Sequence, residues 1–179
     1  MNAATGVYFK REDYAGFWRR LLIDVIDVFV VAVICLALNI VLGAAAPPGQ
    51  NARIIFASWT VVVFCYFVIL KRFPIGTVGY RVGGVRIVNL EGRPPSWLSL
   101  VVRLGFGFLG PLNVLIDLLW LSGDIHRQAL RDKLANTYVV KRQAQPAGSG
   151  RVVFRNYDIL GFNFMFREIE IRAVADPGV

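Results

Sequence analysis

The chain has 179 residues, of which 56% are hydrophobic and only 18% are charged, and its formal net charge is +8. A soluble domain of this length would carry about 25% charged residues. The composition therefore excludes an ordinary soluble domain and predicts one compact membrane domain. Because the basic residues flank long apolar runs, and no aromatic–basic surface module is visible, we expect them to face a membrane surface and not nucleic acid.

The first apolar run extends from Leu21 to Leu42 and follows a polar head, residues 1–20. Its 22 residues are enough for one bilayer crossing at about 1.5 Å per residue. The apolar core of a signal peptide has only about 7–15 residues. The run also contains two aspartates, so we expect a retained transmembrane helix.

A second apolar run, Ile54 to Leu70, has no charged residue and follows a short link, Gly43 to Arg53. The head, the link and residues 71–96 contain four, one and five basic residues. By the positive-inside rule, the head and residues 71–96 are cytoplasmic and the link is outside.

The third apolar run, Trp97 to Leu121, is interrupted by Arg103, Pro111 and Asp117. The next segment, Gly123 to Arg142, contains five basic residues and is expected inside. Two arrangements stay open. We favour a returning hairpin of two half-length helices, which keeps the basic segment inside. A single crossing is the alternative, because early spans can override later charges.

Two segments, Tyr80–Leu90 and Thr137–Lys141, have the composition of strands and predict a small cytoplasmic β element. Residues 143–150 form a predicted linker after a membrane domain, 1–142. The fold class predicted is an all-α membrane protein, with two clear transmembrane helices, a broken third apolar segment, this β element and a β-rich C-terminal tail.

The tail, residues 151–179, alternates between apolar and polar residues, which predicts strands. Phe162, Phe164 and Phe166 share one face, and the phase then slips to Ile169, which predicts a bulge. An exposed aromatic face is typical of an interaction site. We expect the tail to add strands edge to edge, either to the cytoplasmic β element or to a partner protein.

Polar residues form a stripe on the first helix. At about 100° per residue, Arg20, Asp24 and Asp27 fall on one face. Arg20 and Asp24 are four residues apart and can pair. Asp27 lies deeper and requires a proton, a bound cation or a partner from another element; Asp117 and the segment 127–131 are candidates. The stripe predicts a buried ion-pair network, a cation or proton site, or a contact with lipid headgroups or a partner protein.

The sequence offers little for catalysis. His126 is the single histidine, and the chain has no hydrolytic arrangement of side chains around it. Its two cysteines lack metal-ligand spacing. The G-x-G-x-x-G match at Gly105–Gly110 follows no strand and opens no βαβ unit. We expect no enzyme activity, no catalytic residue, no cofactor and no metal site.

Three segments resemble, in order, the motifs of the RDD family of bacterial membrane proteins. They read AGFWRRLL with Ile26-Asp27, TVGYRVGGVRIV with Gly92, and HRQALRDKLANT with Val139-Val140. The family is named for one arginine and two aspartates, which correspond here to Arg20, Asp27 and Asp132. The chain departs from the pattern with Asp24 in place of a small apolar residue and Asn136 in place of glycine.

The resemblance implies a bacterial inner-membrane protein, and some family members are linked to monovalent cation/proton antiport. The apolar runs and the positive-inside rule predict that it is multi-pass with a cytoplasmic N-terminus. Our first hypothesis is transport of a monovalent cation or proton, with Asp27 as the carboxylate. The alternative is a non-catalytic accessory or assembly subunit of a larger membrane complex, with copies of itself or other membrane subunits as partners. We expect Asp132 to pair with Arg19 or Arg20. The candidate polar network comprises Arg20, Asp24, Asp27, Asp117 and Asp132.

Overall fold

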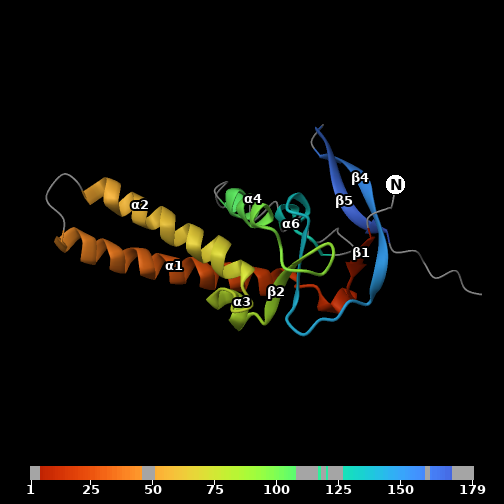
Figure 1. Ribbon diagram of the computed structural model, residues 1–179, viewed down its shortest axis with the longest axis horizontal. Coiled ribbons are helices and arrows are strands. Elements are labelled where there is room, and N and C mark those ends of the chain that lie inside the picture. The colour runs from red at the N-terminus through yellow and green to blue at the C-terminus, as the bar shows by residue number, and fades with distance from the viewer. Residues whose placement is uncertain are drawn as a thin grey trace, which may run out of the picture.

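The computed structural model describes residues 5–45, 51–107, 117, 120, 127–159 and 162–170. Two long helices project from a packed end that contains shorter helices and two β-sheets (Figure 1). The elements in chain order are β1 (Thr5–Tyr8), the 3-10 helix η1 (Arg11–Asp13), α1 (Phe17–Ala45), α2 (Asn51–Phe64), the π-helix η2 (Cys65–Leu70), α3 (Val78–Val82), β2 (Val85–Asn89), α4 (Trp97–Gly107), α6 (Leu130–Leu134), β3 (Thr137–Lys141), β4 (Gly148–Ile159) and β5 (Phe162–Glu170).

Both predicted apolar helices are present. Helix α1 runs away from the packed end, and α2 with η2 returns beside it (Figure 1). Within the described residues, two helical stretches, Phe17–Ala44 and Ala52–Leu70, are long and apolar enough to cross a membrane. Their mean hydropathies over the most apolar window are 2.9 and 2.1.

The third apolar segment is shorter as a helix than either of these. Helix α4 has 11 residues, short of the roughly 20 that a crossing requires. Arg103 of α4 pairs with Asp132, and Asp117, from the second half of the segment, pairs with Arg131. Both halves therefore reach α6 at the packed end, which favours the returning hairpin. Most of residues 108–126 lie outside the described part of the chain.

The small β element is an antiparallel pair, β2–β3, in which Ile87 lies opposite Val139. Strand β3 has the predicted bounds. The prediction of a strand from Tyr80 is wrong, because Val78–Val82 form helix α3. Thr77 caps that helix by accepting a hydrogen bond from the backbone N–H of Tyr80, at 3.4 Å. Gly84, with φ of +60°, then turns the chain into β2.

The β2–β3 sheet is buried on both faces. Its side chains alternate between two apolar clusters, one against the long helices and one against the N-terminal head and tail. The first includes Ile23, Val68, Tyr80, Val85, Ile87, Leu100 and Val139, and the second includes Phe9, Tyr14, Val88, Leu90, Tyr138, Val140 and Ile169. This sheet thereby joins the membrane helices to the rest of the packed end.

The prediction of an all-α fold is wrong, because the described residues form two antiparallel sheets besides the helices. The second sheet has the order β1–β4–β5 and contains both the tail and part of the N-terminal head. Strand β1 has only four residues, too few for a period-2 pattern to reveal. The tail therefore pairs with the head, an arrangement that the sequence analysis did not anticipate, and its pairing begins at Gly148.

The predicted bulge in the tail is also wrong. Strands β4 and β5 pair without interruption from Arg151↔Glu170 to Ile159↔Phe162. The change of phase arises because β5 is buried on both faces near its end. Glu168 lies on one face against Lys133, and Ile169 lies on the other against the core.

Candidate functional site

The fold divides the predicted stripe on α1 into two separate polar groups. Asp132, Arg20 and Arg103 form the first, which we call the Asp132 cluster. The second, the Asp27 site, comprises Asp27 and the groups that bond it: Tyr66, Lys71, Thr77 and Gly79. All three family residues are thus used, but in two places.

In the Asp132 cluster, one buried carboxylate is held between two guanidinium groups. Arg20 of α1 pairs with one oxygen of Asp132, as predicted, and Arg103 of α4 pairs with the other. Arg20 also donates to the carbonyls of Ala15, at 2.9 Å, and Arg127, at 2.8 Å. The cluster therefore joins α1, α4 and α6 at the packed end.

Burial alone would raise the pKa of the Asp132 carboxyl. The positive charges of Arg103 and Arg20 outweigh that effect and hold this pKa well below its usual range. Asp132 consequently stays ionised at any physiological pH. Its contribution to stability is present above the unfolded pKa, about 3.9, and is lost as the pH falls towards the folded value.

A second arginine bridge lies beside this cluster. Arg131 of α6 pairs with Asp24 at 2.6 Å and with Asp117 at 3.0 Å. Its backbone N–H also donates to Asp117, at 3.1 Å. The spacing predicted an ion pair between Arg20 and Asp24, but in the structure Asp24 pairs with Arg131. Asp24, which departs from the family pattern, thus adds a further link between α1 and α6.

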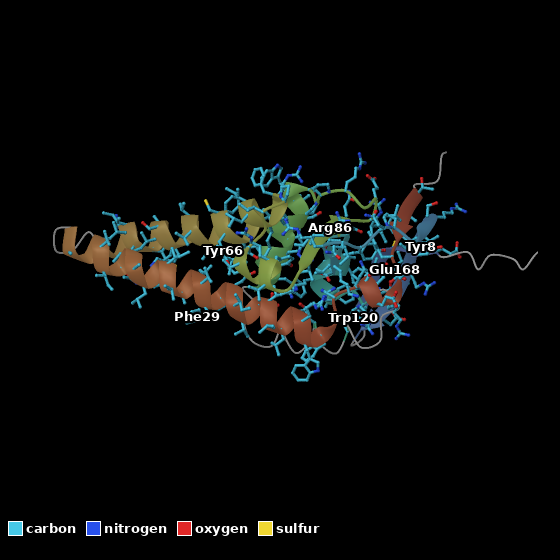
Figure 2. The ribbon with its side chains drawn as sticks, turned by 90° about the horizontal axis from the view of Figure 1, so that it is seen from below. Tyr8, Phe29, Tyr66, Arg86, Trp120 and Glu168 are labelled. Carbon is cyan, nitrogen blue, oxygen red and sulfur yellow. The ribbon has the colours of Figure 1, made fainter. Side chains whose placement is uncertain are left out.

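Asp27 is fully buried on α1 and accepts three hydrogen bonds from other elements. The Tyr66 hydroxyl donates at 2.9 Å, the Thr77 hydroxyl at 2.7 Å and the Gly79 N–H at 2.7 Å. The ammonium group of Lys71 lies 4.0 Å from the carboxylate. Tyr66 lies where the two long helices approach each other, whereas Phe29 lies on the outer side of α1 (Figure 2). The site joins α1 to η2 and α3.

Two residues position these donors. A side chain at position 79 would put its Cβ 2.7 Å from the carboxylate oxygen of Asp27, so only glycine lets the α3 backbone bond it. Tyr66 belongs to the π-helix η2, and such distortions within helices are frequent at functional sites. The distortion and the glycine together deliver a hydroxyl and an N–H to one carboxylate.

A third contact attaches the tail to the last family motif. Buried Lys133 of α6 pairs with Glu168 of β5, and its ammonium group also lies 3.3 Å from the Tyr157 hydroxyl. The ring of Trp120 lies 5.3 Å from that of Tyr157, and Trp120 and Glu168 lie at the same end of the molecule (Figure 2). The sequence predicted that the tail would pair with the cytoplasmic β element or a partner protein, and it did not indicate this link to α6.

Sequence reasoning also missed the partners of the predicted residues. Arg103 was visible as the single charge of α4, and Thr77 and Gly79 stand at the start of the second motif. Tyr66 and Lys71 gave no signal, because the end of an apolar run does not reveal which side chain reaches another helix. Asn136 has φ of 52°, the left-handed conformation that explains the glycine of the family pattern.

The carboxylates at both sites link separate elements of the packed end. One oxygen of Asp27 accepts two hydrogen bonds and the other accepts one. Beside it, Arg20, Arg103 and Arg131 balance Asp24, Asp117 and Asp132. Among the described residues, no group of three or more His, Cys, Asp or Glu side chains could hold a metal ion.

Comparison with known proteins gives a family and one relative. Residues 14–136 match the RDD family. The chain is similar to YckC, an uncharacterized protein of Bacillus subtilis (strain 168), with 29% identity over 131 residues. That alignment covers 70% of this chain and 83% of YckC. No solved structure matches. The match takes in all three segments that carry the Asp132 cluster and the Asp27 site.

Proposed function

This chain belongs to the RDD family, and from that premise we propose that it is a non-catalytic accessory or assembly subunit of a larger membrane complex. Helices α1 and α2 anchor it, and the packed end with its two sheets is the part that meets other proteins. Its partners are further copies of this chain or other membrane-protein subunits.

The paired state of the polar groups carries this proposal. A transport carboxylate must exchange its ligand, whereas the oxygens of Asp27 accept hydrogen bonds from Tyr66, Thr77 and Gly79. A buried carboxylate that accepts hydrogen bonds from several neighbouring elements holds those elements together. The same bonds explain why a charged residue is tolerated on an apolar helix, where an unpaired one would cost several kcal/mol, about 2.5–3.5 on insertion scales.

The small number of spans supports the same proposal. The two candidate spans found among the described residues are too few to enclose a pathway by themselves, and only 11% of the most apolar window of each is buried against the described part of the chain. The remaining helix faces are available to lipid and to helices of other subunits.

We further propose that the protein resides in the bacterial inner membrane as a multi-pass protein with a cytoplasmic N-terminus. Both sheets lie at the end of the helix pair where α1 begins and η2 ends (Figure 1). The basic head and residues 71–96 belong to that end, which the positive-inside rule assigns to the cytoplasm. An impermeant thiol reagent added to intact cells should label a cysteine at Gln50 and not one at Glu91. Labelling of position 91 and not of position 50 would contradict the proposed orientation.

Native mass measurement after mild-detergent extraction tests the accessory role. We expect a particle well above a small multiple of 20.0 kDa that contains other membrane proteins in fixed ratio. A particle of this chain alone, with cation/proton exchange activity in vesicles, would refute the accessory role.

Transport of a monovalent cation or proton is the second candidate, and one observation favours it. Lys71, the nearest cation to Asp27, is 4.0 Å away, too far for a tight ion pair. A loosely paired buried carboxylate on a membrane helix is where a proton or cation could exchange. The decisive assay therefore concerns Asp27.

A further inference from the structure

A cavity of about 270 Å³ lies where the second span ends and the packed end begins. It is lined by the last residues of that helix and the turn after it, by β2, and by Arg142, which follows β3. Arg86 of β2, one of its lining residues, is exposed in the middle of the packed end (Figure 2). The cavity is distinct from the Asp132 cluster.

Among the described residues, four cationic side chains and no carboxylate line this cavity: Lys71, Arg72, Arg86 and Arg142. The three arginines are held by backbone carbonyls. Arg72 donates to Pro95, Arg86 to Ala144 at 2.9 Å, and Arg142 to Pro74 at 2.8 Å. A carbonyl orients a guanidinium group but does not neutralise it.

The charge of these arginines is uncompensated by the described part of the chain. Of the four cations, only Lys71 has a carboxylate within 4.0 Å there, namely Asp27. Like charges gathered in one hollow raise its positive potential and attract an anion. Planar guanidinium groups with several N–H donors fit phosphate oxygens particularly well.

The surroundings indicate which phosphate would bind. Phe73 and Ile75 line the cavity and are 54% and 56% exposed, only a few residues beyond the end of the second span at Leu70. The guanidinium group of Arg72 lies 5.0 Å from the ring of Trp97, a residue type enriched at the bilayer interface. A free phosphate ion needs no apolar rim, whereas the glycerol and upper chains of a lipid do.

We propose that this cavity binds the phosphate of an anionic phospholipid headgroup from the leaflet that the packed end faces. The volume is slightly below the range of about 300–1,000 Å³ for small-molecule sites, so it admits a headgroup and leaves the acyl chains outside. The site rests on the bilayer placement proposed above, but not on the accessory role. Basic pockets beside membrane helices are a general means of recognising such lipids.

Lipid retention by purified full-length protein in neutral detergent tests the proposal. The probes are phosphatidylglycerol, phosphatidylcholine and inorganic phosphate, and native mass spectrometry counts the bound molecules. The test variant is Arg86→Gln/Arg142→Gln, because both side chains are exposed and lie outside the two polar groups on α1. The control, Arg151→Gln/Arg167→Gln, removes the same charge from exposed positions of β4 and β5.

We expect the wild type and the control to prefer phosphatidylglycerol over phosphatidylcholine. The test variant loses two basic residues and should bind phosphatidylglycerol roughly thirtyfold more weakly, from the usual contribution of a basic residue near an anionic surface. Equal retention of both lipids by the wild type would overturn the proposal. Displacement of phosphatidylglycerol by millimolar inorganic phosphate would assign the cavity to the free ion and would overturn the lipid as its ligand. A measured mass that shows no partner subunits would refute the accessory role but would leave the lipid site standing.

Discussion

Asp132 and Asp27 are both fully buried carboxylates of the same chain, yet their surroundings are very different. Asp132 lies between the full positive charges of Arg20 and Arg103. Asp27 is bonded by two hydroxyl groups and one N–H, with its nearest cation 4.0 Å away. The difference shows that two aspartates of one family pattern serve two junctions. Asp132 joins α1, α4 and α6, and Asp27 joins α1, η2 and α3.

Asp132→Asn should have the largest effect, because it leaves two buried guanidinium groups facing a neutral amide. Removal of one partner from a buried ion pair typically costs about 3–5 kcal/mol. We expect that loss in the unfolding free energy of the detergent-solubilised protein, measured by chemical denaturation. Asp158→Asn is the control, because Asp158 is an exposed aspartate that accepts a hydrogen bond from the side chain of Asn163, at 2.8 Å. Equal unfolding free energies of the two variants would show that the Asp132 cluster does not hold the helices together.

Charge exchange sharpens this prediction. Since Asp132 pairs with Arg103 as well as Arg20, the double variant Arg20→Asp/Asp132→Arg would restore one pair and place two cations together. We expect it to recover only part of the stability that either single reversal loses. A double variant no more stable than the worse single variant would argue against the Arg20–Asp132 contact.

The next largest effect is the pH dependence of the difference in unfolding free energy between the wild type and Asp132→Asn. The pKa of folded Asp132 is lowered, so its stabilisation is complete above the unfolded value of about 3.9 and declines below it. The gap in unfolding free energy between the wild type and Asp132→Asn should therefore be constant from pH 7 to about pH 5. By about pH 3 it should shrink by roughly 1 kcal/mol. A gap that did not change with pH would mean that the two states share one pKa.

Much of this contrast was beyond sequence analysis, for a physical reason. Helical spacing put Arg20, Asp24 and Asp27 on one face, and the third motif supplied Asp132 as a partner for Arg20. Spacing within one helix, however, says nothing of which distant element covers each turn of that face. In the structure, Arg131 pairs with Asp24, and groups of η2 and α3 donate hydrogen bonds to Asp27.

The fold shows the same limit. Long apolar runs and the strand β3 were predictable because each is a local pattern with a distinct composition. The pairing of β1 with β4 was not, because it joins four residues near the N-terminus to a strand that begins at Gly148. Helix α3 was hidden in a β-branched segment, where the cap at Thr77 outweighed strand propensity.

Asp27→Asn should be milder than Asp132→Asn. The amide oxygen can still accept some of the hydrogen bonds, and the variant leaves no pair of guanidinium groups exposed to each other. We expect a loss of about 1–3 kcal/mol in unfolding free energy, the range for a buried hydrogen-bonding group that loses partners. Tyr66→Phe removes a hydroxyl that donates to Asp27 and accepts from the backbone N–H of Val78, at 3.1 Å, and should cost about 1–2 kcal/mol. A larger loss for Asp27→Asn than for Asp132→Asn would reverse the comparison.

The smallest effect concerns the tail. Glu168→Gln removes the charge that faces Lys133 but keeps a hydrogen-bonding group beside Tyr157. Because the glutamine oxygen can still accept hydrogen bonds from Lys133 and the Tyr157 hydroxyl, we expect only about 1 kcal/mol of local destabilisation. Protease cleavage within residues 143–150 should become faster, with the membrane helices unaffected. Glu170→Gln, an exposed change on the same strand, is the control. Cleavage at the same rate in both variants would show that the contact with Lys133 does not attach the tail.

The central claim is that Asp27 holds helices together and does not carry ions. Cation/proton exchange in vesicles of purified protein tests it most directly, with wild type, Asp27→Asn and protein-free vesicles compared at equal protein and lipid. We predict no exchange above the protein-free level for the wild type, and a lowered unfolding free energy for Asp27→Asn. Exchange by the wild type that disappears in Asp27→Asn, while that variant stays fully folded, would contradict the claim and establish Asp27 as the transport carboxylate.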